Sequence, residues 1–239
     1  MSPILKPVAK DIPLLILAGG RATRLKGLSA NLPKYLMPIG DHKCFADEHL
    51  AWAHKMGFRK IFLSVGYLAD QVIQHCKDGS QWGLHIEYIH DGDQPLGTGG
   101  AVKKSLSFSY QYMAVTYGDT LLNFEVEKFL QMGINNQSLA AMTLFENQVA
   151  GHICNADFQS GKVKYNKIHP DPSWKYIDYG FLLLQRDFVS SFGTETPLDL
   201  AVPLSLLSEK GQLDGFICHD RFWEIGSPEA LQEFQKNFV

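Results

Sequence analysis

Short apolar runs alternate with amphipathic segments throughout the first half of the chain. The predicted strands cover residues 14–17, 60–65, 84–89 and 112–116, and the predicted helices between them cover residues 45–56, 68–76 and 99–106. This alternation is typical of βαβ units, in which parallel strands form one sheet and helices cover both of its faces. Loops at the carboxyl ends of such strands are where ligands usually bind.

The second half of the chain has a different pattern. Residues 138–145, 151–155, 162–168 and 177–185 are predicted strands with only turns between them, followed by helices near 187–192 and 203–210, a strand at 215–218 and a closing helix at 228–237. Strands joined by turns indicate an antiparallel or mixed extension of the sheet. We therefore expect an α/β fold with a mainly parallel, Rossmann-like mixed sheet, helices on its flanks and a small antiparallel extension.

Length and charge limit the classes of function. The 239 residues, 45% of them hydrophobic, are enough to bury a large core, and no linker or repeat divides them, so one domain over residues 1–239 is expected. The net charge of −3 provides no general basic field, which argues against nucleic-acid binding. No apolar run approaches about 18 residues and no signal-peptide core opens the chain, so we expect a cytoplasmic protein without membrane contact.

The cysteines and histidines show no short-range metal motif. Cys44, Cys76, Cys154 and Cys218 are far apart and form no CxxC pair, so they are interpreted as reduced thiols rather than disulfides or a zinc site. The histidines lack an HExxH or similar spacing.

A segment rich in glycine and arginine, LAGGRATRL at residues 17–25, follows the first predicted strand. Gly19 and Gly20 allow the backbone to approach a ligand closely, so that successive N–H groups can point at phosphate oxygens. Arg21 and Arg24 would add charge-assisted hydrogen bonds. The spacing fits neither GxGxxG nor GxxxxGK[ST], and these residues alone are equally compatible with a solvated surface turn.

Two more loops are candidate binding segments. Lys34 lies in NLPKYLMPIG, where two prolines stiffen the backbone around it, although a single lysine is usually only solvated. QPLGTGGAVKK, at residues 94–104, opens a predicted helix at Thr98 or Gly99. Its small residues leave room for a nucleobase against the backbone, and the alternative is an ordinary helix start with permissive glycines.

Two acidic residues are candidate metal ligands. Gly118 and Asp119 end a predicted buried strand, where a carboxylate beside phosphate-binding loops is suited to Mg²⁺, although Asp after Gly is also common in plain turns. Glu224 lies in a short apolar segment and is expected to be partly buried, which requires a partner for its charge, and a cation is one candidate. Ser227 and Pro228 predict the cap and first residue of the closing helix.

Taken in order, these motifs resemble the sugar-1-phosphate nucleotidyltransferases, also called nucleoside-diphosphate-sugar pyrophosphorylases. LAGGRATRL with PKYLMP is similar to the family's GGxGTRL…PK signature, and LGTGGA is similar to its base-binding loop. YGD resembles the metal-binding aspartate motif, and WEIGSPE resembles the closing W-D-x-G-T-P-E element. The resemblance covers nearly the whole chain. The residues of the motifs are most similar to those of heptose-1-phosphate guanylyltransferases.

The resemblance implies a role for each matching residue. Arg24 and Lys34 would hold the leaving pyrophosphate, Asp119 and Glu224 would bind Mg²⁺, and Lys167 would hold the sugar phosphate. The implied nucleotide contacts, in a half that covers about residues 1–125, are Leu17, Ala18, Gly19, Gly20, Gln94, Gly97, Thr98 and Gly99. The implied sugar-phosphate contacts, mostly in a half that covers about residues 126–239, are Gly118, Lys167, Asp178, Tyr179 and Gly180.

The chain departs from the family pattern at three positions. Ala22 replaces a glycine of the signature loop, which adds a β-carbon there. Glu224 replaces an aspartate and is longer by one methylene. Asn166 precedes Lys167 where many relatives have glutamate, which leaves the identity of the sugar open.

The reaction that the resemblance implies joins an NTP and a sugar 1-phosphate to give an NDP-sugar and pyrophosphate. GTP and a heptose 1-phosphate are favoured, for the synthesis of surface polysaccharide precursors, and a homo-oligomer is compatible with the pattern. Two alternatives stay open: a cytidylyltransferase that acts on a small non-sugar phosphate, and a non-catalytic regulatory protein that binds nucleotide sugars.

Overall fold

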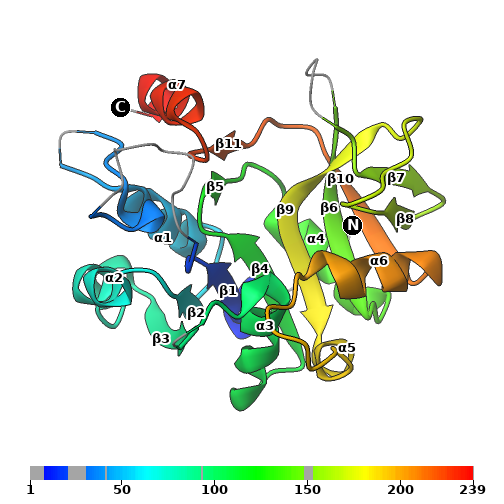
Figure 1. The fold of residues 1–239 in the computed structure, drawn as a ribbon, viewed down its shortest axis with the longest axis horizontal. Coiled ribbons are helices and arrows are strands. Elements are labelled where there is room, and N and C mark those ends of the chain that lie inside the picture. The colour runs from blue at the N-terminus through cyan, green and yellow to red at the C-terminus, as the bar shows by residue number, and fades with distance from the viewer. Residues whose placement is uncertain (1–7, 21–30, 41, 93, 148–152, 239) are drawn as a thin grey trace, which may run out of the picture.

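A nine-stranded mixed sheet forms the centre of the protein (Figure 1). The structure is a computed structural model, and it describes residues 8–20, 31–40, 42–92, 94–147 and 153–238. The strand order is β3-β2-β1-β4-β9-β6-β10-β8-β7. The strands are β1 (Leu14–Leu17), β2 (Lys60–Val65), β3 (His85–His90), β4 (Tyr112–Tyr117), β6 (Ala140–Glu146), β7 (Ala156–Gln159), β8 (Lys162–Tyr165), β9 (Tyr176–Gln185) and β10 (Leu213–Cys218). A separate two-stranded ribbon pairs β5 (Thr120–Leu121) with β11 (Trp223–Glu224).

The two halves of the sheet differ in strand direction. β3, β2, β1 and β4 are all parallel, and Leu14 of β1 lies opposite Ile61 on one side and Ala114 on the other. β9 is antiparallel to both β4 and β6, β10 is parallel to β6, and β8 and β7 complete the sheet as antiparallel strands. The expected α/β fold with an antiparallel extension is therefore confirmed.

Helices cover both faces of the sheet. One core contains buried residues of α1 (Phe45–Lys55), α2 (Ala69–Cys76), α4 (Val126–Asn135) and α7 (Pro228–Phe238), and the other contains those of α3 (Gly97–Lys104), α5 (Arg186–Ser190) and α6 (Ala201–Glu209). Strand β1 shows why two cores form, because Leu14 and Ile16 belong to the first core and Leu15 belongs to the second. Alternate side chains of a strand point to opposite faces.

Helix α4 was missed by the sequence analysis, which assigned no helix or strand between residues 116 and 138. Its buried residues Val126, Phe129, Leu130 and Gly133 follow the helical spacing of three and four. Gly133 is a poor helix former, yet a β-carbon there would lie 2.5 Å from Cδ2 of Leu183. The glycine therefore lowers local helix propensity while it allows α4 to pack closely on β9.

The predicted strand at residues 151–155 was wrong. Residues 151 and 152 lie outside the described residues, residues 153–155 are not in a strand, and β7 begins at Ala156. The turn at Ser160 and Gly161, with φ angles of 50° and 82°, pairs Gln159 with Lys162 and so sets the position of β7. The next predicted strand also ends early, since the Asn166 side chain accepts the N–H groups of residues 168 and 169 in a turn.

The lengths of the helices and the state of the cysteines both bear on expectations from the sequence. No helix in the part of the chain that the structure describes is long and apolar enough to cross a membrane. All four cysteines are free thiols, as predicted.

Candidate active site

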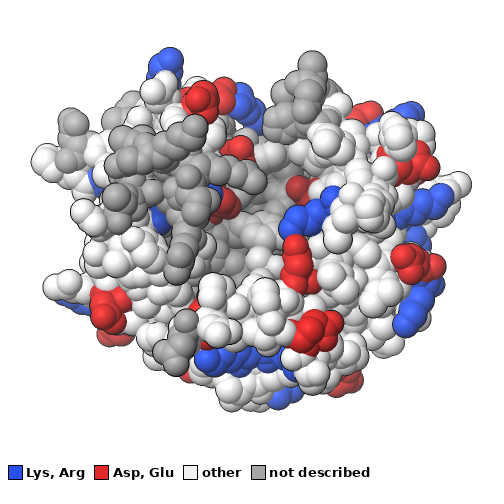
Figure 2. Space-filling view, in the orientation of Figure 1, with Lys and Arg blue, Asp and Glu red and all other residues white. Residues whose placement is uncertain are grey.

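A cavity of about 440 Å³ opens at the carboxyl ends of the parallel strands. Figure 2 shows that this face of the molecule is hollowed near its middle and that acidic and basic side chains border the hollow. The end of an open parallel sheet is the usual ligand site of such folds. Nine of the predicted site residues line the cavity: Leu17, Ala18, Gly19, Gly20, Lys34, Gly97, Thr98, Gly118 and Asp119.

Gly118 brings the ends of β1 and β4 into close contact. A β-carbon on Gly118 would lie 2.8 Å from Cα of Ala18 and 2.9 Å from the carbonyl oxygen of Leu17. The Gly118 N–H donates to the same Leu17 oxygen at 3.0 Å. Only glycine permits this approach, and it places the next residue, Asp119, at the cavity wall.

The second glycine loop is fixed by Leu198. Gly97 has a φ of 76°, and a β-carbon there would lie 2.4 Å from the Leu198 carbonyl oxygen. The Gly99 N–H donates to this oxygen at 2.8 Å, so Gly99 is buried behind the loop while Gly97 and Thr98 line the cavity. Gln94 is exposed and does not line the cavity.

Lys34 is held in place by its backbone and by a carboxylate. Pro33, with an extended conformation, precedes the short 3-10 helix Lys34–Leu36. The Lys34 Nζ donates to Oδ2 of Asp119 at 2.5 Å, and Thr120 donates to the other carboxylate oxygen at 3.0 Å. The lysine side chain is only 17% exposed. Two residues that are 85 positions apart thus form an ion pair at the cavity wall.

Glu224, near the carboxyl end of the chain, lies close to the Lys34–Asp119 pair. It lies opposite Thr120 in the β5–β11 ribbon, and the N–H of Ile225 donates to the Asp119 carbonyl at 2.9 Å. Oε2 of Glu224 and Nζ of Lys34 lie 3.5 Å and 3.7 Å from the point that a β-carbon on Gly226 would occupy. The prediction that Glu224 is partly buried was wrong, because the two-stranded β5–β11 ribbon leaves the Glu224 side chain exposed.

Asp199 connects the second glycine loop to Lys167. The Lys167 Nζ donates to one oxygen of Asp199 at 2.8 Å, and the Thr98 hydroxyl donates to the other at 3.3 Å. Burial alone raises the pKa of Asp199, but the hydrogen bonds from Lys167 and from the Ala201 N–H outweigh burial, so the pKa is lowered. The sequence analysis missed Asp199, because an aspartate just before a helix is typical of a cap, and its Ala201 contact is of this kind.

Tyr117 and Asp178 are two further titratable groups of this region, and burial affects the pKa of both. Burial raises the pKa of Asp178 to about 6, although the Gly180 N–H at 2.9 Å and the charge of Lys167 oppose the rise. Tyr117 lines the cavity, and burial together with nearby groups that include Asp178 and Asp199 raises the pKa of its hydroxyl. Gly180 is adjacent, since a β-carbon there would lie 3.4 Å from the Tyr117 ring. Tyr117 was missed, although it directly precedes the Gly-Asp pair that the sequence analysis used.

Tyr179 and Arg24 are the last two predicted contacts. The Tyr179 hydroxyl is 2.9 Å from the carbonyl oxygens of Asn123 and Asp220, to which it donates, so it joins β9 to the segments around β5 and β11. Arg24, together with Arg21 and Ala22, lies outside the described residues.

The fold and the cavity define an α/β protein with glycine-rich loops at the ends of its parallel strands. The model of the nucleotidyl transferase family matches residues 14–152, and the chain belongs to this family. It is 29% identical over 224 residues to D-glycero-alpha-D-manno-heptose 1-phosphate guanylyltransferase of Campylobacter jejuni subsp. jejuni serotype O:2, a match that covers 93% of this chain and 98% of the relative. An enzyme of the same name from Aneurinibacillus thermoaerophilus is 27% identical over 229 residues, with 93% and 96% covered.

Solved structures agree on the fold. HddC from Yersinia pseudotuberculosis superposes with a TM-score of 0.80 at 24% identity, covering 95% of this chain and all of that chain, and it has also been solved in complex with GMP-PN. The resemblance that was drawn from the motifs is confirmed. The protein is an enzyme of the sugar-phosphate nucleotidyltransferase class.

Proposed function

We propose that the protein transfers a guanylyl group from GTP to a heptose 1-phosphate and releases pyrophosphate, as a step in the synthesis of surface polysaccharide precursors. The observation that carries the proposal is the Lys34–Asp119 pair at the wall of a cavity formed by parallel strand ends. The choice of base and sugar is supported by the names of the Campylobacter and Aneurinibacillus relatives and by the GMP-PN complex of HddC.

In the proposed reaction, an oxygen of the sugar phosphate attacks the α-phosphorus of the nucleotide. A new phosphorus–oxygen bond forms as the bond to the bridging oxygen breaks, and the electron pair leaves with pyrophosphate. A phosphate monoester is already ionised near neutral pH, so no general base is required. The main task of the protein is to neutralise and align two anions, with Lys34 and Arg24 on the leaving group and Lys167 on the attacking phosphate.

Enzymes of this family generally use a divalent metal ion. We propose Mg²⁺, because Asp119 and Glu224 offer carboxylate oxygens, which this ion prefers together with phosphate oxygens. Asp119 pairs with Lys34, and the Glu224 carboxylate and the Lys34 ammonium group both lie close to Gly226, which supports a shared site for the ion and the phosphates. When bound, the ion would neutralise the negative charge that develops on the phosphates.

Asp91 supports guanine as the base. Its carboxylate lines the cavity, and Oδ2 lies 3.1 Å from the point that a β-carbon on Gly19 would occupy. Burial raises the pKa of Asp91, and the charge of Lys104 offsets only part of this rise. The Watson–Crick edge of guanine presents two adjacent donors, N1–H and the 2-amino group, and a carboxylate can accept both.

We also propose that residues 1–239 act as one nucleotidyltransferase domain. The support is the single nine-stranded sheet, in which β9 of the second half pairs directly with β4 of the first half.

An assay of pyrophosphate release tests the proposal, with four NTPs crossed against sugar 1-phosphates that include heptose 1-phosphates. We expect the fastest release with GTP and a heptose 1-phosphate, and none without a divalent metal. Turnover of CTP with a small non-sugar phosphate would favour the first alternative. Binding without release for every pair would favour the regulatory one.

A further inference from the structure

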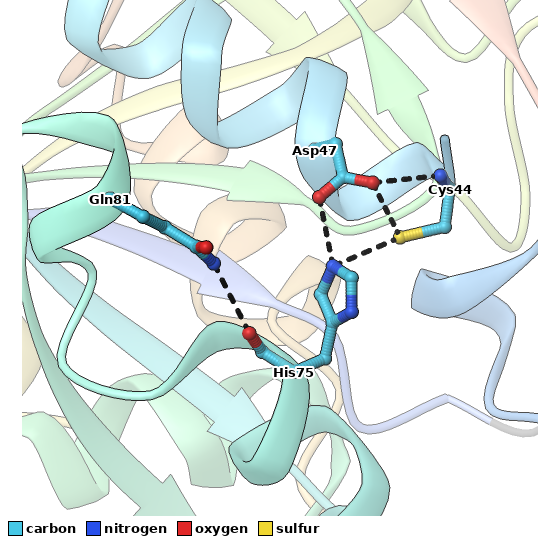
Figure 3. Close-up of polar contacts among 4 residues, drawn as sticks. All are labelled: Cys44, Asp47, His75 and Gln81. Carbon is cyan, nitrogen blue, oxygen red and sulfur yellow. Dashed lines mark hydrogen bonds and ion pairs between the residues drawn. The ribbon is translucent and has the colours of Figure 1, made fainter. Parts of the chain in front are cut away.

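Cys44, Asp47 and His75 form a compact group outside the cavity (Figure 3). Cys44 caps the start of α1, Asp47 lies in the first turn of this helix, and His75 lies in the last turn of α2. Their potential ligand atoms all lie within 4.8 Å of one another. A thiol, a carboxylate and an imidazole, which are three common metal ligands, thus meet where two helices pack together.

The donor atoms point toward one another with distances close to those of a metal site. Nε2 of His75 lies 3.4 Å from Sγ of Cys44 and 2.8 Å from Oδ1 of Asp47, and the Cys44 sulfur lies 3.2 Å from Oδ2 of Asp47. Zinc bonds of about 2.3 Å to sulfur and about 2.0–2.2 Å to nitrogen and oxygen put tetrahedral ligand atoms about 3.4–3.6 Å apart. The three side chains would therefore separate by less than about 1 Å to admit the ion.

The surroundings favour a cation with one position open to water. The side chain of Asp47 is 22% exposed and that of His75 is 37% exposed. The Cys44 N–H donates to the Asp47 carboxylate at 2.8 Å, and Gln81 donates to the carbonyl of His75 at 3.2 Å. The first of these bonds orients the Asp47 carboxylate, and the second fixes the backbone of α2 at His75. The carboxyl end of α2 favours positive charge, and because burial raises the pKa of the Cys44 thiol, the ion has to displace the proton from this sulfur.

Tyr35 provides an independent observation. Its hydroxyl is completely buried and has no hydrogen-bond partner among the residues for which placement is described. Its ring packs against that of Phe45, the residue that follows Cys44 at the start of α1, with the ring centroids 6.3 Å apart. Buried hydroxyls are rarely unpaired, and a nearby ion or water is a usual explanation. Tyr35 also directly follows Lys34 of the active site.

We infer that Cys44, Asp47 and His75 bind one transition-metal ion of the Zn²⁺ class, which joins α1 to α2 outside the nucleotide cavity. Sulfur and nitrogen donors select such an ion over Mg²⁺ or Ca²⁺. On binding, a metal–sulfur bond replaces the S–H bond of Cys44, and the proton goes to solvent.

From their spacing in the sequence, the cysteines were interpreted as thiols that take no part in a metal site. Short motifs cannot reveal the site, because His75 is 31 positions from Cys44 and 28 from Asp47. The same side chains also form a capping box at the start of α1, and a cap alone predicts no metal affinity.

A cobalt titration of the full chain tests the inference. The protein is treated with a chelator and titrated with Co²⁺ in excess Mg²⁺, which saturates the carboxylates of the active site. We expect one Co²⁺ per chain, a thiolate-to-cobalt charge-transfer band, visible bands typical of tetrahedral Co²⁺, and displacement of both by Zn²⁺. Cys44→Ser should remove the charge-transfer band.

The ligand variants have matched controls. His75→Gln and Asp47→Asn should weaken Co²⁺ binding by at least the about 10- to 100-fold that loss of an outer hydrogen-bond partner costs. Cys154→Ser and His85→Gln, which change the same residue types elsewhere, should bind Co²⁺ as the unmodified protein does. The absence of a charge-transfer band in the unmodified protein, or an unchanged band in Cys44→Ser, would overturn the inference.

A second measurement needs no substitution and so does not depend on how the variants fold. Alkylation by iodoacetamide is followed by mass spectrometry of the Cys44 and Cys154 peptides, with and without Zn²⁺. Zn²⁺ should slow the reaction of Cys44 at least about tenfold and leave Cys154 unchanged, since only a ligated sulfur loses its nucleophilicity. Equal rates at Cys44 with and without Zn²⁺ would also overturn the inference.

Discussion

The parallel half and the antiparallel half of the sheet build their parts of the site in different ways. Around β1 and β4 the cavity is shaped by backbone, since Gly118 and Gly97 permit approaches that a β-carbon would block. Around β8 and β9 the groups are side chains that contact one another, as Lys167 does with Asp199. The backbone cradle is proposed to hold the nucleotide, and the side chains around Lys167 are proposed to contact the sugar phosphate. The comparison predicts that substitutions in the two halves will affect different kinetic parameters.

Asp119→Asn should cause the largest effect. The substitution keeps the shape of the side chain but removes the charge that pairs with Lys34 and is proposed to bind Mg²⁺. We expect kcat for pyrophosphate release to fall by about 10²–10³-fold, the range for loss of one group that stabilises charge in the transition state. Circular dichroism should show an unchanged fold. Turnover within a few-fold of the unmodified enzyme would remove Asp119 from the proposed metal site.

Lys167→Met should mainly weaken the use of the sugar phosphate. Loss of a hydrogen bond to a charged group costs about 1.5–3 kcal/mol, which corresponds to a rise in KM for the sugar phosphate of about 10- to 150-fold. The KM for the NTP should stay unchanged in the same assay. If the KM for the NTP rises instead, the division between the two halves is wrong.

Asp199→Asn should have a smaller effect on the same parameter. The Lys167–Asp199 pair is about half exposed, at 52% and 49%, so its loss should change stability by no more than about 1 kcal/mol. The KM for the sugar phosphate should change several-fold, because Lys167 loses the carboxylate that positions it. In the double variant with Lys167→Met, Asp199→Asn should add nothing further. Additive effects would show that Asp199 acts independently of Lys167.

The last prediction concerns stability, which should depend on pH through Asp178. Its pKa is raised to about 6, so the native state holds this proton more tightly than the unfolded chain does. The stabilisation is therefore complete below the ordinary pKa of aspartate and is lost as the pH rises through about 6. Thermal unfolding of Asp178→Asn should lack this part of the pH dependence, about 3 kcal/mol at about 1.4 kcal/mol per pKa unit. An identical pH profile in both proteins would contradict the raised pKa.

The two halves also differ in how well the sequence predicted them. In the parallel half, alternation of apolar runs located β2 residue for residue, and glycine motifs located the loops that line the cavity. Those signals are local, because backbone approaches require glycine at fixed positions. Asp91 and Tyr117 were missed because their position at the cavity depends on which strand ends lie side by side in the sheet.

In the antiparallel half, the decisive contacts join distant segments. Asp199 meets Thr98 across 101 positions, and no local pattern records this. Helix α4 was missed for a related reason. Gly133 lowers the local helix propensity, but glycine is required there because α4 packs against Leu183 of β9. Turn chemistry at Ser160 and Gly161 was the signal that would have placed β7 correctly.

The central claim is that the parallel half binds the nucleotide without help from the sugar-phosphate lysine. Calorimetric titration of a non-hydrolysable GTP analogue into Lys167→Met, with Mg²⁺ present, tests it most directly. The account predicts an affinity equal to that of the unmodified enzyme within about twofold, while the affinity for the sugar 1-phosphate falls at least about tenfold. Loss of affinity for the GTP analogue by a similar factor would contradict the claim.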